Sequence, residues 1–147
     1  MLYQKIEKYF DSDKQLAVLE REYQSVLEKI DNYSDLFVTL TDSASLSSAL
    51  CELTGLYMSI STVVAIATEI LDNKEAKAYV DAVSRKQYSG EKVLDSVLKK
   101  EAKLEIQMYS RVKNLFASYL DKCDRAIYVC QSLLKPLERE RNFTKYQ

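Results

Sequence analysis

Histidine is absent from the sequence, so the commonest general base and metal ligand of proteins is missing. The three cysteines, Cys51, Cys123 and Cys130, form no Cys-x-x-Cys pair and have no histidine with which to complete a zinc site. No glycine-rich phosphate loop occurs. We therefore predict no catalytic residues, no metal and no cofactor, and a small enzyme ranks third among the functions considered.

Glycine and proline are scarce, with two glycines and one proline in 147 residues. Few chain breakers favour long helices over a turn-rich sheet protein. The hydrophobic content of 47% is sufficient for a core, and the length is that of one domain. The sequence predicts a single all-α domain, an antiparallel helical bundle with a long coiled-coil-like C-terminal helix.

Basic residues are missing between Ile30 and Asn73. Residues 1–73 contain five basic and twelve acidic residues, a net charge of −7, whereas residues 74–147 contain sixteen and ten, a net charge of +6. A basic half suits a polyanion such as nucleic acid, and an acidic half suits the basic half of another subunit. The alternative is that the helices have ordinary solvated faces that differ in charge.

No hydrophobic run reaches the length of a membrane span. The uncharged stretch 53–68 is shorter than the ~20 apolar residues required and contains several serines and threonines, so we expect a buried bundle helix and no membrane contact. The N-terminus has no signal-peptide core. We expect a cytoplasmic protein in a reducing compartment.

A heptad pattern indicates one long helix over residues 91–137. Apolar residues follow one another there at steps of three and four, which places them on one helical face, where Cys123 and Cys130 act as small hydrophobic residues. The stripe is wider than a two-stranded seam needs, so we predict a homo-oligomer of undetermined subunit number. Its predicted interface consists of Tyr109, Val112, Phe116, Tyr119, Cys123, Ile127, Cys130 and Leu133.

Other segments are predicted from similar patterns. Residues 2–40 and 46–71 are expected to form an acidic helical hairpin, with Asp42 or Ser43 capping the second helix. The stripe loses phase at Asp72 and Asn73, so a break or kink is expected before a basic helix over 74–88. Gly90 follows that helix as a C-terminal glycine does, and residues 138–147, after Pro136, are expected to form a frayed or accessory tail.

Cations and tyrosines gather around the predicted reversal at Gly90. Cations that follow a phosphate backbone, together with rings that stack on bases, are what sequence-tolerant single-strand binding requires. The alternative is an ordinary wet surface, because acidic residues are interspersed and residues 74–113 carry a net charge of only +4. The predicted nucleic-acid-binding residues are Lys77, Arg85, Lys86, Tyr88, Lys92, Lys99, Lys100 and Lys103.

The order of these features resembles the UvsY family of tailed-phage recombination mediators. The residues that carry the likeness are Leu56-Tyr57, then Arg85-Lys86-Gln87-Tyr88-Ser89-Gly90, then a C-terminal helix with YLDKCDRAIYVCQSLLK at 119–135. The likeness covers roughly residues 52–140. The resemblance implies an all-helical oligomer that binds single-stranded DNA and helps to load a recombinase onto strands covered by single-strand-binding protein.

Two functions of different classes therefore remain open. The first is a recombination mediator whose partners are single-stranded DNA, its own copies, a recombinase and a single-strand-binding protein. The second is a structural or interaction protein, such as an assembly factor, a scaffold or a host-directed inhibitor, that holds a protein partner on its heptad face. The preference between single strands and duplex is not determined by the sequence.

Overall fold

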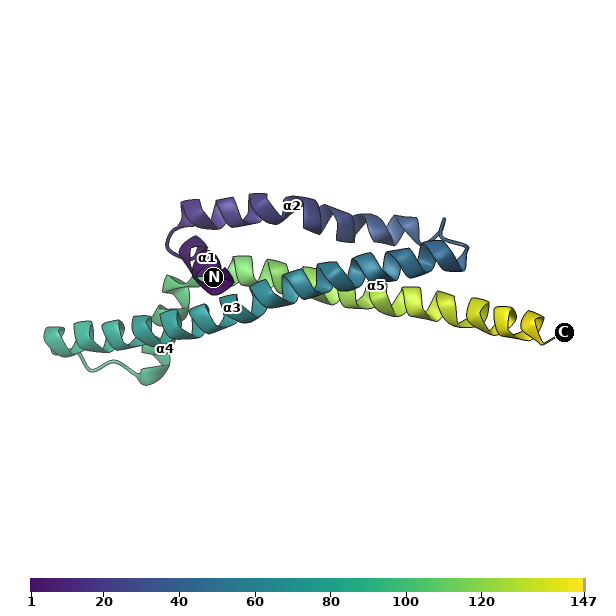
Figure 1. Ribbon diagram of the computed structural model, residues 1–147. Coiled ribbons are helices and arrows are strands. Elements are labelled where there is room, and N and C mark those ends of the chain that lie inside the picture. Colours follow the sequence, from purple (N-terminus) through teal and green to yellow (C-terminus); the bar gives the residue numbers. More distant parts are fainter. Residues whose placement is uncertain (147) are drawn as a thin grey trace. The chain divides into compact units, whose positions relative to one another are not determined.

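The computed structural model describes residues 1–146 and consists there of five helices without a strand (Figure 1). Helices account for 88% of the chain, which confirms the prediction of an all-α fold. The self-association of the chain remains a prediction. The helices are α1 (Leu2–Tyr9), α2 (Asp13–Leu36), α3 (Ser43–Ser89), α4 (Asp95–Glu105) and α5 (Gln107–Lys145).

The helices are distributed over two compact units. The first unit consists of Met1–Arg21 and Val63–Leu115, and the second of Glu22–Thr62 and Phe116–Gln147. Helices α2, α3 and α5 each contribute residues to both units. That the chain folds as a single domain remains a prediction.

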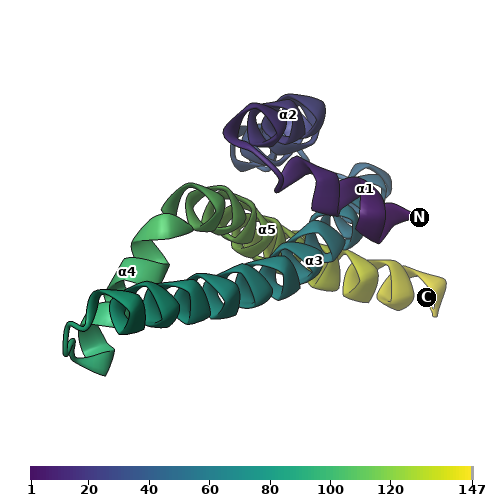
Figure 2. The ribbon, with the colours of Figure 1, turned by 90° about the vertical axis from the view of Figure 1, so that its left-hand side faces the viewer.

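Helix α1 of the first unit lies across α3 (Figure 2). Most of its apolar face is buried, because Ile6 and the following Phe10 are each only 1% exposed, although Leu2 in the first turn is 50% exposed. The ring of Phe10 stacks on Tyr109 at the start of α5, with 6.2 Å between ring centroids. The ammonium group of Lys74 lies 4.8 Å from the centroid of the same Tyr109 ring. These contacts tie α1, α3 and α5 together by burial, stacking and a cation–π interaction.

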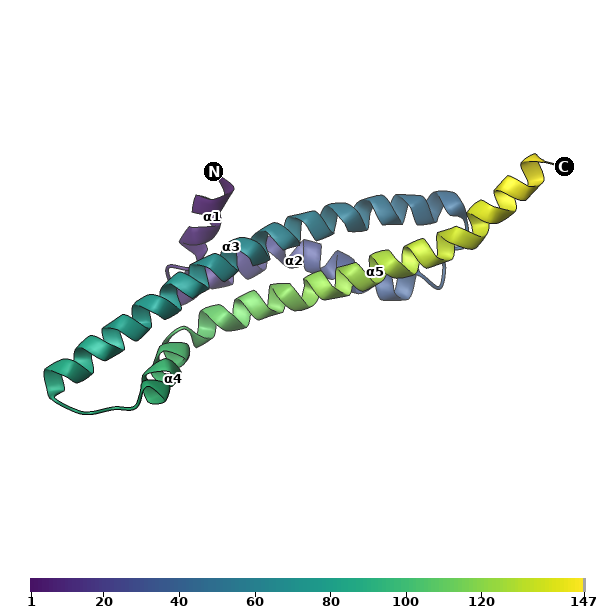
Figure 3. The same cartoon turned by 90° about the horizontal axis from the view of Figure 1, so that it is seen from below.

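Helix α4 lies beside the last turns of α3, in the same unit (Figure 3). It buries Leu98, Ala102 and Ile106, which follow one another at intervals of four and so share one face. The chain reverses between the two helices at Gly90, whose φ of +69° lies in the left-handed region that glycine adopts without steric cost. The glycine predicted to end the basic helix does so.

The second unit is a three-helix arrangement of parts of α2, α3 and α5. Helices α2 and α3 form an antiparallel hairpin, and α5 runs alongside them (Figure 1). The predicted cap of α3 is confirmed, since Asp42 accepts a 2.8 Å hydrogen bond from the backbone N–H of Ser45. Apolar side chains from all three helices are buried in this unit: Leu27, Ile30, Tyr33, Leu46, Ala49, Leu53, Ile60, Phe116, Cys123, Ala126, Cys130 and Leu134.

Asp31 joins α2 to α5 at the surface of the second unit. Its carboxylate accepts a 2.7 Å hydrogen bond from the hydroxyl of Tyr119 and forms an ion pair with Lys122. The hydrogen bond from Lys122, followed by that from Tyr119, lowers the pKa of Asp31 below its usual value. The ionised form is therefore favoured in the folded chain.

The lowered pKa of Asp31 predicts a pH dependence of stability. Its contribution is fully present above the ordinary aspartate pKa of about 4 and is lost as the pH falls below that value and through the lower folded-state pKa. In the Asp31→Asn variant, the free energy of unfolding measured in urea should depend less on pH in this acidic range. The difference from the wild type should be less than about 1 kcal/mol, because both side chains of the ion pair are about half exposed. Asp35→Asn, an exposed change on the same helix, should keep the wild-type profile. Identical profiles for all three proteins would contradict this assignment.

The break expected at Asp72 and Asn73 does not occur, because α3 is continuous from Ser43 to Ser89. Neither residue is a steric helix breaker, so the change of hydrophobic phase does not interrupt the backbone. The buried face shifts instead: Ile70 and Leu71 are both buried before the shift, and Ala78 is the next buried residue. The separate basic helix over 74–88 is thus the last part of α3.

The prediction of one helix over 91–137 is wrong at its start, in its interior and at its end. Residues 91–94 are not helical, and a turn at Ile106 separates α4 from α5. The turn allows Ile106 to be buried with Leu98 on one face of α4. At the other end α5 continues to Lys145 through Pro136, which interrupts one backbone hydrogen bond without ending the helix. The tail predicted over 138–147 is therefore helical as far as the structure describes it.

Within residues 1–146, α3 is the one helix that is long and apolar enough to cross a membrane. A helix in the core of a soluble protein meets the same criteria. Only 22% of its most apolar stretch is buried, so the expected buried bundle helix is largely exposed. Residues such as Gly55 and Met58 lie on this open side.

The two glycines allow a matched stability test. A Cβ on Gly55 would meet nothing within 4 Å, so Gly55→Ala should stabilise the chain by about 0.5–1 kcal/mol through helix propensity. Gly90→Ala has equal space but forces a side chain into positive φ, and should destabilise by about 1 kcal/mol. Urea unfolding followed by circular dichroism measures both changes. A destabilising Gly55→Ala would contradict the open environment seen at this position.

Candidate nucleic-acid interface

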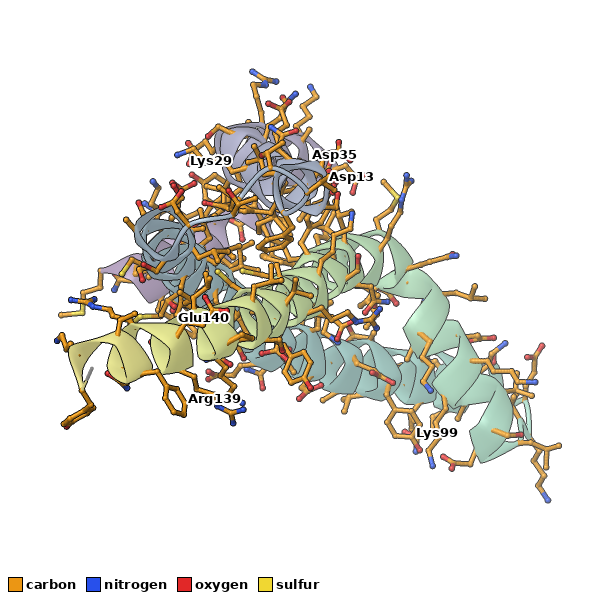
Figure 4. All side chains as sticks on the ribbon, turned by 90° about the vertical axis from the view of Figure 1, so that its right-hand side faces the viewer. Asp13, Lys29, Asp35, Lys99, Arg139 and Glu140 are labelled. Carbon is orange, nitrogen blue, oxygen red and sulfur yellow. The ribbon has the colours of Figure 1, made fainter. Side chains whose placement is uncertain are left out.

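All eight residues predicted to contact nucleic acid lie in the first unit. The end of α3 carries four of them, the connection after Gly90 carries Lys92, and α4 carries the other three. In Figure 4, Lys99 points away from the ribbon of α4. The return of the chain after Gly90 thus places α4 beside the end of α3, where Tyr79 contacts Asp95 and Arg85 contacts Glu105 (Figure 3).

A hollow of about 660 Å³ opens between the end of α3 and α4. Arg85 and Lys86 line it, but so do Glu91, Glu101 and Glu105. Three carboxylates against two cations make the hollow itself unsuitable for a phosphate group. A polyanion would therefore contact the cations on the rim of the hollow and on the outer side of α4.

Arg85 and Lys86 both form ion pairs with these carboxylates. A guanidinium nitrogen of Arg85 lies 3.7 Å from a carboxylate oxygen of Glu105, and the ammonium of Lys86 lies 3.2 Å from one of Glu91. The side chains of Arg85 and Glu105 are both more than half exposed, so the pair is worth little to stability and is readily exchanged. A phosphate must compete with these carboxylates before it binds Arg85 or Lys86.

Lys99 has a closer partner than either of those cations. Its ammonium lies 2.9 Å from Asp95, one helical turn earlier, and Asp95 also accepts a hydrogen bond from the hydroxyl of Tyr79. The hydrogen bond from Tyr79, with that from Lys99, lowers the pKa of Asp95. Asp95 correspondingly raises the pKa of Lys99. Tyr79 is therefore engaged with α4 and is not free to stack on a base.

The remaining four lysines, Lys77, Lys92, Lys100 and Lys103, are exposed and form no ion pair within residues 1–146. Tyr88 is 96% exposed at the end of α3, two residues before the chain reverses. Unpaired cations near an open aromatic ring are the combination that single-strand binding uses. These residues form the part of the predicted site that is available without breaking an ion pair.

The predicted oligomer interface is mostly covered by the chain itself. Val112, Phe116, Cys123 and Cys130 are 0–4% exposed, whereas Leu133 is 39% exposed. Tyr109, Tyr119 and Ile127 are partly exposed. Most of the stripe is thus buried within a single chain, and the assignment of these residues to an interface between copies remains a prediction.

The two buried thiols belong to the core of the second unit. Cys123 donates to the backbone carbonyl of Leu53 at 3.3 Å, and Cys130 to that of Leu46 at 3.1 Å. Burial, with a smaller contribution from Asp124, raises the pKa of the Cys123 thiol to about 11. This thiol is therefore protonated and unreactive at neutral pH. Residues 1–146 contain no group of three metal-binding side chains.

A second group of cations and rings lies near the end of α5, where sequence analysis placed only a tail. Arg139, Asn142, Phe143 and Tyr146 line a hollow of about 210 Å³. The spacing of Arg139, Phe143 and Tyr146 at i, i+4 and i+7 is a one-face helical pattern that the sequence contains. It was missed because Pro136 was expected to end regular structure.

No family model matches the chain, and neither a curated protein nor a solved structure is significantly similar to it.

Proposed function

We propose that this protein binds single-stranded nucleic acid without catalysing a reaction, through the end of α3 and the outer side of α4. The observation that carries the proposal is the 96% exposure of Tyr88 at the end of α3, in a unit that also carries four exposed lysines without an ion pair within residues 1–146. A single-strand site needs cations for the backbone and an open ring for a base. The exposed ring has no intramolecular contact that would explain it as a core residue.

The resemblance to the UvsY family extends this proposal to a biological role. A recombination mediator holds a single strand and passes it to a recombinase, so it requires reversible, sequence-tolerant contacts. The exposed ion pair of Arg85 and the partly exposed pair of Lys86 suit such contacts, because both can be exchanged for a phosphate. Self-association, a recombinase and a single-strand-binding protein are part of this proposed role.

The binding experiment is fluorescence anisotropy of a labelled oligothymidine strand at low and moderate salt, with duplex DNA as competitor. We expect salt-dependent binding that single strands compete best. Glu105→Gln should raise affinity about twofold to fivefold, because Arg85 no longer has its carboxylate partner. Glu20→Gln makes the same change in net charge on α2 and should have little effect.

Three outcomes would count against the proposal. Failure of the wild-type protein to bind at low salt excludes single-strand binding altogether. Equal effects of Glu105→Gln and Glu20→Gln would mean that affinity follows net charge rather than this site. Unchanged affinity and salt dependence after joint Arg85→Ala and Lys86→Ala substitution would remove these two residues from the site.

A protein-binding role is the second candidate, and one observation favours it. The most apolar stretch of α3 is only 22% buried, and Met58 on this helix is 64% exposed. Exposed apolar surface of this kind marks interaction sites. Two results would favour this role. Retention of the protein on oligonucleotides would not depend on salt, and the protein would capture a protein partner that the Met58→Lys variant does not capture.

A further inference from the structure

We infer that the end of α5 is a second contact site for single-stranded nucleic acid, in which Phe143 and Tyr146 stack on bases and Arg139 binds the backbone. The inference rests on the proposed function and adds a site in the second unit. It assigns a ligand class to residues outside the basic site of α3 and α4. The resemblance described above ends near residue 140, so Phe143 and Tyr146 lie outside it.

The aromatic residues at the end of α5 have no structural role within the chain. Leu134 is the last buried residue of this helix, and every residue from Glu138 to Tyr146 is exposed. Phe143 is 75% exposed and Tyr146 is 93% exposed. Large rings on an unpacked helix end contribute nothing to a core, so their contribution comes from contact with another molecule.

The side chains around the rings favour a nucleic acid. Arg139 and Asn142 line the same hollow of about 210 Å³ as the two rings, and Arg139 stands clear of the α5 ribbon in Figure 4. Residues 135–146 hold four basic and two acidic residues, a net charge of +2. None of these four cations forms an ion pair within the described residues. This differs from Arg85 and Lys86, which must exchange a carboxylate.

An anionic membrane surface is less well matched by this helix end. An interfacial helix needs a continuous apolar face, whereas here a cation and an amide flank two rings and Glu138 and Glu140 lie on the same segment. Two exposed rings with a guanidinium group in the same hollow instead suit a strand whose bases can stack and whose phosphate can bind the cation. Stacking depends on the π face of the ring, which gives the inference a specific test.

The test uses the full chain and an oligothymidine strand that contains one 5-iodouracil. Ultraviolet crosslinking followed by peptide mass spectrometry should identify Phe143 or Tyr146. Joint Phe143→Ala and Tyr146→Ala substitution should weaken binding at least tenfold. Joint substitution of the same residues by leucine should weaken it comparably, because leucine keeps apolar area but cannot stack.

Tyr128→Ala is the matched control, because this ring is 71% exposed on the same helix but lies outside the hollow. It should bind as the wild type does, and circular dichroism should show the same helix content for all variants. The inference is overturned if the double alanine variant binds with wild-type affinity. The proposed function still stands in that case if neutralisation of the α4 lysines weakens binding. Wild-type protein that binds no oligonucleotide at low salt overturns both. The nucleic-acid assignment is overturned if the protein binds vesicles of anionic lipid and not the oligonucleotide, and if this vesicle binding requires Phe143 and Tyr146.

Discussion

Replacing Phe116 with alanine is expected to lower the free energy of unfolding by about 3–5 kcal/mol. The ring is 1% exposed, and it meets the ring of Tyr23 edge-on at 5.4 Å between centroids. The change removes buried apolar area, leaves a cavity in a closely packed site and breaks the aromatic pair. Urea titration followed by circular dichroism measures the loss.

Leu115→Ala is the control for Phe116→Ala. Leu115 precedes Phe116 in the same helix but is 37% exposed, so its truncation should cost about 1 kcal/mol or less. A small effect of Phe116→Ala, equal to that of Leu115→Ala, would mean that the heptad face of α5 is not packed within the chain. That outcome would restore the stripe as a candidate interface between copies.

Changing Lys99, Lys100 and Lys103 together to glutamine is expected to weaken single-strand binding roughly 100-fold at low salt. These three lysines are the cations of α4, and all three side chains are exposed. Loss of these cations should also reduce the slope of log affinity against log salt by about 1–2, less than three unpaired lysines would give, because Lys99 is paired with Asp95. Glutamine is a good helix former, so α4 should be retained. Anisotropy titrations at several salt concentrations measure both quantities.

The control for the lysine triple is Lys8, Lys14 and Lys29 changed to glutamine. These residues are exposed and lie on α1 and α2, outside the predicted nucleic-acid interface of α3 and α4. Their substitution makes the same change in net charge. Equal losses of affinity in the two triple variants would show that binding follows the overall charge of the chain. A loss confined to the α4 variant supports contact at that helix.

The all-α fold was predictable because the pattern that determines it is local. Apolar residues at steps of three and four, with few glycines and prolines, indicate helices whatever their partners are. The caps at Asp42 and Gly90 were predictable for the same reason, since each depends on a few neighbouring residues. The continuity of α3 through Asp72 and the turn at Ile106 were not predictable, because no breaker residue marks or excludes a turn at either position.

What lies against each apolar face could not be read from periodicity. The stripe through Phe116 and Cys123 indicates that a face is buried, but it does not distinguish a helix of the same chain from one of another copy. The structure places Leu53 of α3 against Cys123. Similarly, Glu105 is 20 residues from Arg85 in the sequence, and only the reversal at Gly90 makes them a pair.

The ion pairs of Arg85 and Lys86 affect what a salt titration would count. When a phosphate displaces Glu105 or Glu91, the strand releases a bound cation, but the freed carboxylate remains attached to the protein and attracts a cation in turn. Net ion release at these two positions is therefore smaller than at Lys100 or Lys103, which have no partner to displace. The measured salt slope would then underestimate the number of phosphates held, and the carboxylates would act as internal counterions that promote the departure of the strand.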